Sequence, residues 1–180
     1  SLSFVPYKKD DTNDKPVVPE GDYLLKETFN GNNSEGGNDN KWNAITSVAD
    51  PVFDNEGWTS ANDKIYGANM CIRIGTSNLP GTITSPTFTV NGTATLSFKA
   101  GAWDSKGDGK TLTVTASNGS LSQGTFDMTR GAWTNYSTTI TATGNVKLTF
   151  TTSAKRFFLD DVYVTNASTG IVSTTADTAK

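Results

Sequence analysis

The 180-residue sequence contains no histidine and only one cysteine, Cys71. Without histidine, no Ser-His-Asp or Cys-His catalytic group can form, and histidine-ligated zinc, copper and haem sites are excluded as well. A lone cysteine makes no internal disulfide. Because Cys71 stands between Met70 and Ile72, we interpret it as a small core residue rather than a reactive thiol.

Charge and long apolar runs are also scarce. Charged residues make up 18% of the chain, and 15 basic against 18 acidic side chains leave a net charge of −3. This balance argues against a nucleic-acid partner. No apolar run reaches membrane-spanning length, so direct membrane insertion is not expected. There is no signal peptide, and we therefore expect a chain whose targeting segment has been removed.

Threonine, serine and asparagine are abundant, with 29, 16 and 16 residues. Threonine is β-branched and suits a half-solvated strand. Period-two alternation is clearest at residues 95–100, where Leu96 and Phe98 face one side and Ser97 and Lys99 the other. Further strand-like segments occupy residues 23–29, 70–74, 82–90, 111–116, 135–141, 146–150 and 157–164. This pattern predicts an all-β, antiparallel β-sandwich without a convincing helix.

Short polar pairs between these segments predict the turns of the sandwich. The pairs are Asn91-Gly92, Asp108-Gly109, Asn118-Gly119 and Gly144-Asn145. Asparagine, aspartate and glycine tolerate the positive φ angles of tight turns, so we expect a chain reversal at each pair.

Composition divides the chain into three parts. Residues 1–20 are interpreted as a lead-in and linker, because residues 8–20 are charged and carry Pro16 and Pro19. The alternative is an ordered arm packed on the domain, while residues 1–7 could end an upstream domain. Residues 21–166 form the predicted β-sandwich domain, and residues 167–180 a small, polar C-terminal tail.

Several short motifs carry a family resemblance. In chain order they are ETFNG at residues 27–31, GW at 57–58, ITSP at 83–86, LSF at 96–98, GAW at 131–133 and FLDDV at 158–162. In this order the sequence resembles the choice-of-anchor J and cleaved-adhesin type of β-jelly-roll module of Bacteroidetes surface proteins. Such modules are similar to carbohydrate-binding, galactose-binding-like jelly rolls. The resemblance implies a non-catalytic accessory module, extracellular or on the outer-membrane surface, beside an upstream domain and often on a lipoprotein.

Asp160 and Asp161 interrupt an apolar strand, and they are the candidate metal ligands. Leu159 and Val162 fall on opposite faces by parity, so the strand is either buried on both faces or bulged at the two acids; we favour a β-bulge. Adjacent buried carboxylates need a partner. Lys155 and Arg156 could supply salt bridges. The resemblance instead implies a structural Ca²⁺ held by Glu27, Asp160 and Asp161, and both alternatives stay open.

Residues 30–69 are irregular and rich in aromatic and amide side chains, and they supply the candidate ligand residues. A sugar stacks its C–H face on an aromatic ring while amides bond its hydroxyls. We therefore select Trp42, Trp58, Tyr66 and Asn55 as candidates for binding a glycan or polysaccharide. Trp103, Trp133 and Tyr136 are further aromatic candidates. We interpret Trp103 and Trp133 as structural, and burial in the core is the alternative for every tryptophan.

Two functions remain in competition at this point. The first is a carbohydrate-binding accessory module of a surface or secreted protein. The second is a structural or adhesive spacer whose contacts are made by protein surfaces. A hydrolase with two catalytic carboxylates is disfavoured, because no acid pair stands in a recognisable cleft motif.

Overall fold

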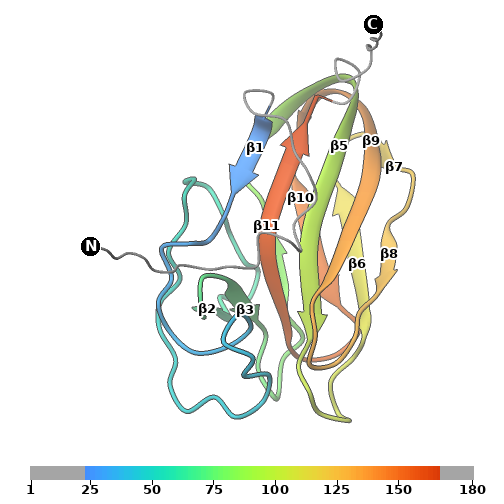
Figure 1. The fold of residues 1–180 in the computed structure, drawn as a ribbon. Helices are drawn as coiled ribbons and strands as arrows, with labels where there is room; N and C mark the ends of the chain where they lie inside the picture. The colour runs from blue at the N-terminus through green and yellow to red at the C-terminus, as the bar shows by residue number, and fades with distance from the viewer. Residues whose placement is uncertain (1–22, 167–180) are drawn as a thin grey trace, which may run out of the picture.

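The computed structural model describes residues 23–166, which form two antiparallel β-sheets packed face to face (Figure 1). The larger sheet has the strand order β2-β3-β11-β5-β9-β7, with β1 also paired to β11. Its strands are β1 (Tyr23–Glu27), β2 (Ile65–Gly67), β3 (Ile72–Ile74), β5 (Phe88–Ala102), β7 (Ser120–Leu121), β9 (Thr134–Val146) and β11 (Phe157–Thr165). The predicted lead-in of residues 1–20 and the tail of residues 167–180 lie outside the described residues.

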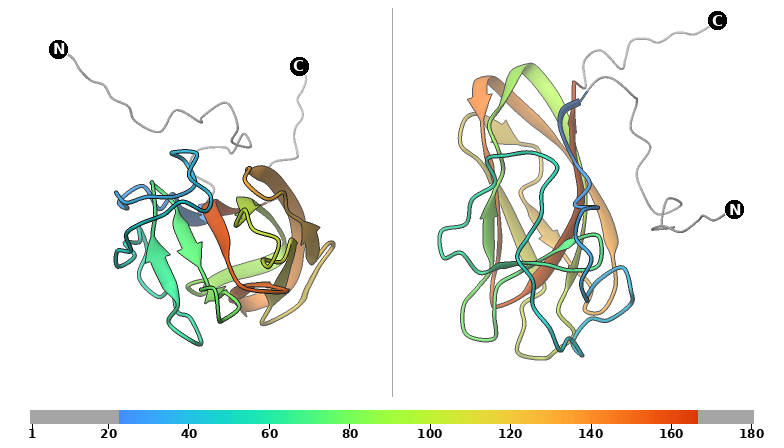
Figure 2. Two further views of the ribbon diagram at one scale, coloured as in Figure 1. Left: turned by 90° about the horizontal axis from the view of Figure 1, so that it is seen from below. Right: turned by 90° about the vertical axis from the view of Figure 1, so that its left-hand side faces the viewer.

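The smaller sheet has the order β4-β10-β6-β8 and covers one face of the larger sheet. Its strands are β4 (Thr82–Thr84), β6 (Thr111–Ala116), β8 (Thr125–Asp127) and β10 (Leu148–Thr152). The two views of Figure 2 show both layers, with the loop of residues 28–64 running along one side. The described residues contain no helix, which confirms the all-β prediction. Accordingly, no helix in this part of the chain could cross a membrane.

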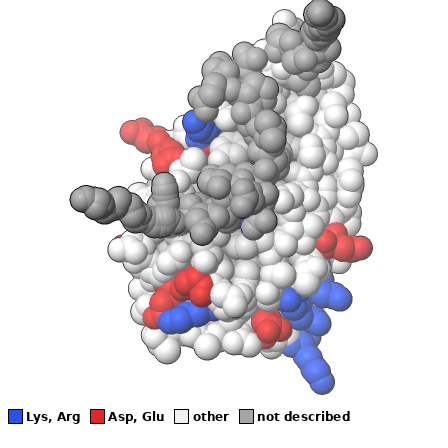
Figure 3. All heavy atoms as spheres, in the orientation of Figure 1, with Lys and Arg blue, Asp and Glu red and all other residues white. Residues whose placement is uncertain are grey.

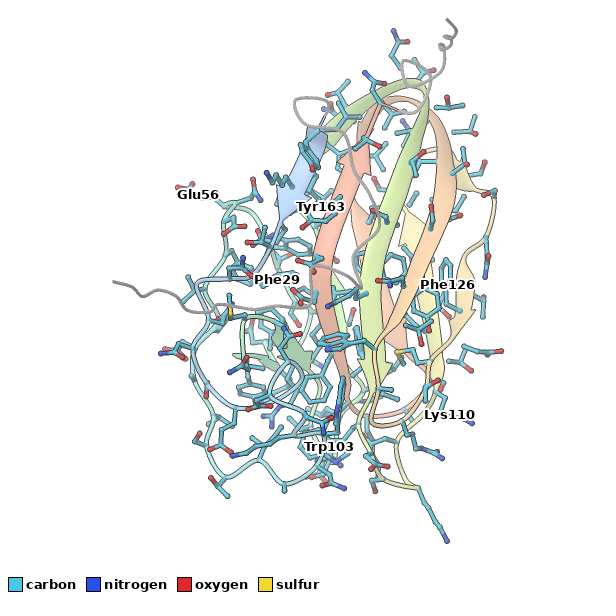
Figure 4. All side chains as sticks on the ribbon, viewed as in Figure 1. Phe29, Glu56, Trp103, Lys110, Phe126 and Tyr163 are labelled. Carbon is cyan, nitrogen blue, oxygen red and sulfur yellow. The ribbon has the colours of Figure 1, made fainter. Side chains whose placement is uncertain are left out.

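The core between the sheets is built from the alternating positions that the sequence indicated. Leu96 and Phe98 of β5, Leu112 of β6 and Phe150 of β10 are fully buried. The Phe98 ring meets the Phe126 ring edge-on with centroids 5.3 Å apart, and Phe126 of β8 is labelled in Figure 4. Burying these faces supplies the main stabilisation of the sandwich.

Two of the predicted turns are wrong. Asn91-Gly92 lies inside β5, and Gly144-Asn145 lies inside β9. These strands pair without interruption from Phe88 to Ala100, and the two glycines stand within this ladder with φ angles of 106° and 112°. Glycine accepts a positive φ in a strand without steric conflict, so the long strands bend here instead of reversing. The other two predicted turns, at residues 108–109 and 118–119, do lie between strands.

A second apolar cluster covers the opposite face of the larger sheet. It contains Trp42, Cys71, Trp103 and Phe158 together with Ala68. Phe158 alternates along β11 with core residues, so its ring points away from the smaller sheet. β11 is therefore buried on both faces, and the burial of Cys71 confirms its interpretation as a core residue.

Candidate functional site

Glu27, the last residue of β1, is a fully buried carboxylate that accepts five hydrogen bonds. Its Oε2 accepts the backbone N–H groups of Phe29 at 3.1 Å and Asp54 at 2.8 Å. Its Oε1 accepts the backbone N–H and the side-chain amide of Asn55, and Nε1–H of Trp58, each at 3.0 Å. Charge-assisted bonds of this kind are the strong ones. Glu27 thus fixes the long loop of residues 28–64 to the end of β1.

Two of the predicted ligand residues, Trp58 and Asn55, belong to this Glu27 arrangement. Trp58 is 8% exposed and stacks on Phe53 with centroids 5.8 Å apart. The Asn55 amide also donates to the carbonyl of Lys26 at 2.6 Å. Trp58 therefore offers no open face to a sugar, and its placement matches the core alternative. The geometry gives Asn55 a role in holding the loop.

Asp160 and Asp161 stand at an irregularity of β11, which confirms the predicted β-bulge. The pairing of β11 with β5 shifts register between Asp160 and Tyr163, and Asp161 has a φ of 53°. A bulge of this kind redirects a side chain out of the alternating pattern. Both carboxylates are fully buried as a result.

Within residues 23–166, the cation beside these two carboxylates is Lys99 of β5, which is itself fully buried. Its Nζ lies 3.8 Å from Oδ2 of Asp160 and 3.8 Å from Oδ2 of Asp161. The Asn38 amide donates to Asp160 at 3.0 Å, and the Tyr163 hydroxyl donates to Asp161 at 3.3 Å. Burial, together with the charges of the two aspartates, raises the pKa of the Tyr163 phenol.

The salt-bridge alternative therefore applies to Asp160 and Asp161, but their partner is Lys99 and not Lys155 or Arg156. The guanidinium of Arg156, one of the two expected partners, binds Asp108 instead, with Nη2 2.9 Å from Oδ1. Lys155 forms no ion pair with either aspartate among the described residues.

The predicted calcium ligands Glu27, Asp160 and Asp161 are not grouped around one point in the described part of the chain. Among residues 23–166, no three His, Cys, Asp or Glu side chains are grouped so that they could hold a metal ion. The oxygens of Glu27 face N–H donors, and Asp160 and Asp161 face the Lys99 ammonium. Such surroundings stabilise an anion and oppose a cation. Calcium binding stays a prediction from the family resemblance.

A pocket of about 390 Å³ lies where the loop of residues 37–42 meets the start of β9. It is lined by two tryptophans, three asparagines and three small residues, namely Trp42, Trp133, Asn38, Asn40, Asn135, Gly37, Gly131 and Ala132. The rings of Trp42 and Trp133 meet edge to face with centroids 5.2 Å apart. Asn40 and Asn135 are exposed. Aromatic surface thus adjoins side-chain amides that can both donate and accept hydrogen bonds.

Backbone close approach shapes this pocket. Asn40 has a φ of 65°, and its Oδ1 accepts Nε1–H of Trp42 at 3.0 Å. A Cβ at Gly37 would lie 2.6 Å from Sγ of Cys71, and a Cβ at Gly101 of β5 would lie 2.9 Å from the Trp42 ring. Only glycine lets the loop and the Trp42 ring sit this close to the sheet.

The indole nitrogen of Trp133 carries an unmet hydrogen-bond donor. Nε1 is buried, and it has no hydrogen-bond partner in the described part of the chain. A buried donor of this kind costs free energy. The Trp133 ring also lies near Lys99, whose Nζ is 5.0 Å from the ring centre.

Tyr66, the remaining predicted ligand residue, lies outside the pocket lining. It belongs to β2, and the guanidinium of Arg73 on β3 lies 4.6 Å from the centre of its ring. The four predicted ligand residues thus occupy three places. Trp42 lines the pocket, Trp58 and Asn55 surround Glu27, and Tyr66 packs on Arg73.

Sequence reasoning missed Trp133 and Asn135 as pocket residues. The sequence favoured a structural role for Trp133. One signal in its Gly-Ala-Trp motif was usable: a glycine at position 131 permits a tight turn just before Trp133, and Gly131 indeed has a φ of 73°. Asn135 could have been found as an outward-facing position of its strand. Neither signal indicates that these residues meet Trp42.

Sequence comparison identifies no relative for this chain: no family model matches it, and no curated protein sequence does. Solved structures do match its fold. The CBM22-1 xylan-binding domain from Paenibacillus barcinonensis Xyn10C has a TM-score of 0.50 at 12% identity, covering 83% of this chain and 97% of that one. The CBM22-1–CBM22-2 tandem domain of the same protein has a TM-score of 0.54 at 12% identity, covering 83% of this chain and 47% of that one.

A similarity to the K3 cleaved adhesin domain of Lys-gingipain from Porphyromonas gingivalis W83 is weaker, with a TM-score of 0.48 at 17% identity over 79% of this chain and 98% of that one. The xylan-binding domain and the tandem domain confirm the jelly-roll β-sandwich. At this level of identity, the similarity concerns the fold and leaves function to the site. Membership of the choice-of-anchor J family stays a prediction.

Proposed function

We propose that this domain is a non-catalytic carbohydrate-binding module and that the pocket at Trp42 and Trp133 is its ligand site. One observation carries the proposal: tryptophan rings and asparagine amides line the same pocket of about 390 Å³. A pyranose presents C–H groups that pack on aromatic carbon and hydroxyls that need both donors and acceptors. An amide supplies both from one side chain.

The size of the pocket favours a short ligand segment. Its volume falls at the lower end of the range of about 300–1,000 Å³ that small-molecule sites occupy. We therefore expect it to hold a chain end or a short oligosaccharide, and not a long stretch of polymer.

The lining residues favour binding over catalysis. Glycoside hydrolysis uses a pair of carboxyl groups beside the scissile bond, and the eight residues that line the pocket include no Asp or Glu. The fold shared with a xylan-binding domain supports the same reading. In this proposal the module serves a surface or secreted protein, beside an upstream domain, and holds that protein on its glycan.

The experiment is a binding survey of the full chain by affinity electrophoresis and calorimetry on neutral and acidic soluble polysaccharides. Asn135→Ala should weaken the affinity about two- to tenfold, as expected for one or two lost hydrogen bonds. Trp133→Ala should abolish retention. The control is Asn145→Ala, which removes another exposed amide at the far end of β9, one that accepts a hydrogen bond from the Thr89 hydroxyl.

Equal binding by wild-type, Asn135→Ala and Asn145→Ala proteins would show that the ligand lies elsewhere. Failure of the wild-type protein to bind any glycan would favour the spacer function. Trp133 packs on Trp42, so thermal unfolding is the check that Trp133→Ala still folds. If this variant does not fold, the Asn135→Ala result decides by itself.

A further inference from the structure

Arg73 of β3 is held between two aromatic rings on the outer face of the larger sheet. Its Cζ lies 4.6 Å from the centre of the Tyr66 ring and 5.5 Å from that of Trp103. Arg156 approaches the same tryptophan, with its Cζ 4.0 Å from the ring centre. Two guanidinium groups therefore contact the Trp103 ring, and cation–π contacts hold each of them in position. We call the Tyr66 and Trp103 rings beside Arg73 the aromatic platform. Figure 4 shows Trp103 at the end of the sandwich away from β1.

The two arginines differ in how their charge is compensated. Arg156 makes a two-pronged contact with the buried carboxylate of Asp108, with Nε at 3.0 Å and Nη2 at 2.9 Å. The Arg73 side chain has no ion pair or hydrogen bond within residues 23–166, and its Nε is buried without a partner. Arg73 itself remains partly exposed. Its guanidinium is a planar fork that can bind two oxygens of an anion at once.

The electrostatics at Arg73 favour the arrival of an anion. Burial is the main cause that lowers the pKa of Arg73; Tyr66 partly opposes this shift, and the positive charge of Arg156 adds to it. The charged guanidinium is thus less stable than it would be in water. An oxyanion at this position would offset both effects and would satisfy the donors that the chain leaves unmet.

The loops that follow Trp103 and precede β11 carry further positive charge. Residues 103–110 and 153–156, which are joined by the Gly109 N–H donating to Ala154 O, carry Lys106, Lys110, Lys155 and Arg156 against Asp104 and Asp108. Arg130 binds the carbonyls of Lys106 and Asp108 and adds another cation. Lys and Arg side chains gather at the lower right of Figure 3, the region where Figure 4 places Lys110. A chain with a net charge of −3 therefore concentrates positive charge at one end.

We propose that Arg73, on the platform of Tyr66 and Trp103, binds the oxyanion of an acidic glycan, either a uronate carboxylate or a sulfate ester. That the ligand is a glycan rests on the proposed function. That the ligand carries an oxyanion rests on the surroundings of Arg73. The platform adjoins the pocket through the second apolar cluster, since Trp103 stacks on Phe158, and Phe158 in turn contacts Trp42.

The test compares the affinities of the full chain for polygalacturonate, dextran sulfate, a neutral xylan and poly-glutamate, each at two salt concentrations. Arg73→Gln should weaken binding to an acidic glycan about tenfold or more, the loss expected for one charge-assisted two-pronged contact. Its binding to the neutral xylan should not change. Arg73→Lys keeps the charge but loses the fork, so it should give an intermediate loss.

The matched control is Lys110→Gln, which removes one exposed positive charge from the same end of the molecule. A loss equal to that of Arg73→Gln would show unspecific attraction and would overturn the proposal, as would poly-glutamate binding as tightly as the acidic glycans. The two acidic polymers distinguish a carboxylate ligand from a sulfate ligand. Neutral binding without any acidic preference would refute the anion site alone, whereas no glycan binding at all would refute the proposed function with it.

Discussion

The Glu27 arrangement gives a prediction whose magnitude can be worked from the structure. Glu27→Gln keeps the size of the side chain but replaces one oxygen by an NH₂ group. If that group takes the place of Oε2, the N–H groups of Phe29 and Asp54 lose their acceptor. If it takes the place of Oε1, the three donors from Asn55 and Trp58 lose theirs. The better orientation therefore leaves two donors facing another donor, the buried N–H of Phe29 and the partly buried N–H of Asp54.

Each buried donor that loses its partner costs about 1–3 kcal/mol. The expected loss for Glu27→Gln is thus about 2–6 kcal/mol, a large part of the roughly 5–15 kcal/mol that stabilises an ordinary domain. The matched control is Glu56→Gln. Glu56 is exposed and adjoins Asn55 in the chain, and its substitution should change the free energy of unfolding by less than about 0.5 kcal/mol.

Urea unfolding followed by tryptophan fluorescence measures both variants. The midpoint of Glu27→Gln should fall with little change in the slope against urea concentration. Hydrogen exchange at the Asp54 and Asn55 amides should accelerate more than at β5, because their acceptor holds the loop to β1. A loss no larger than that of the control would refute the reasoning, since it would mean that the five hydrogen bonds contribute nothing net.

Two further predictions concern ions. A melting curve distinguishes the two alternatives for Asp160 and Asp161. If Lys99 compensates their charge, Ca²⁺ or a chelator should leave the melting temperature unchanged, because the oxygens of Glu27 also face N–H donors. A calcium-dependent rise that Asp160→Asn abolishes would support the calcium prediction instead. Burial and the nearby aspartates raise the pKa of Tyr163 in the folded protein, so only the unfolded chain loses this phenol proton near its ordinary pKa of about 10, and stability should fall as the pH rises above about 10. In unfolding measurements between pH 8 and 11, Tyr163→Phe should make this fall shallower, and an identical slope would contradict the assignment.

Local pattern was sufficient for most of the sandwich. The alternation at Leu96 and Phe98 predicted the buried face of β5, because side chains in a strand alternate whatever their partner is. The parity conflict between Leu159 and Val162 predicted the bulge at Asp160-Asp161 for the same reason. Local chemistry was misleading at Asn91-Gly92 and Gly144-Asn145. A pair of this kind favours a turn by itself. Here both pairs lie within the long ladder of β5 and β9, because pairing with a distant strand overrides a local preference.

Only the tertiary structure decided the chemistry of the site. Asp160 and Asp161 needed a partner by any reading of the sequence, but it is Lys99, about sixty positions earlier in the chain, that lies beside them, because β5 and β11 are neighbours. Trp42 and Trp133 form a pocket for the same kind of reason, since a loop before β2 folds onto the start of β9. Composition and periodicity indicate which local structure each residue favours and which face of a strand it occupies. They do not show which distant residues come within a few ångströms of each other when strands pair. Ligand binding and electrostatic interactions depend on those short distances.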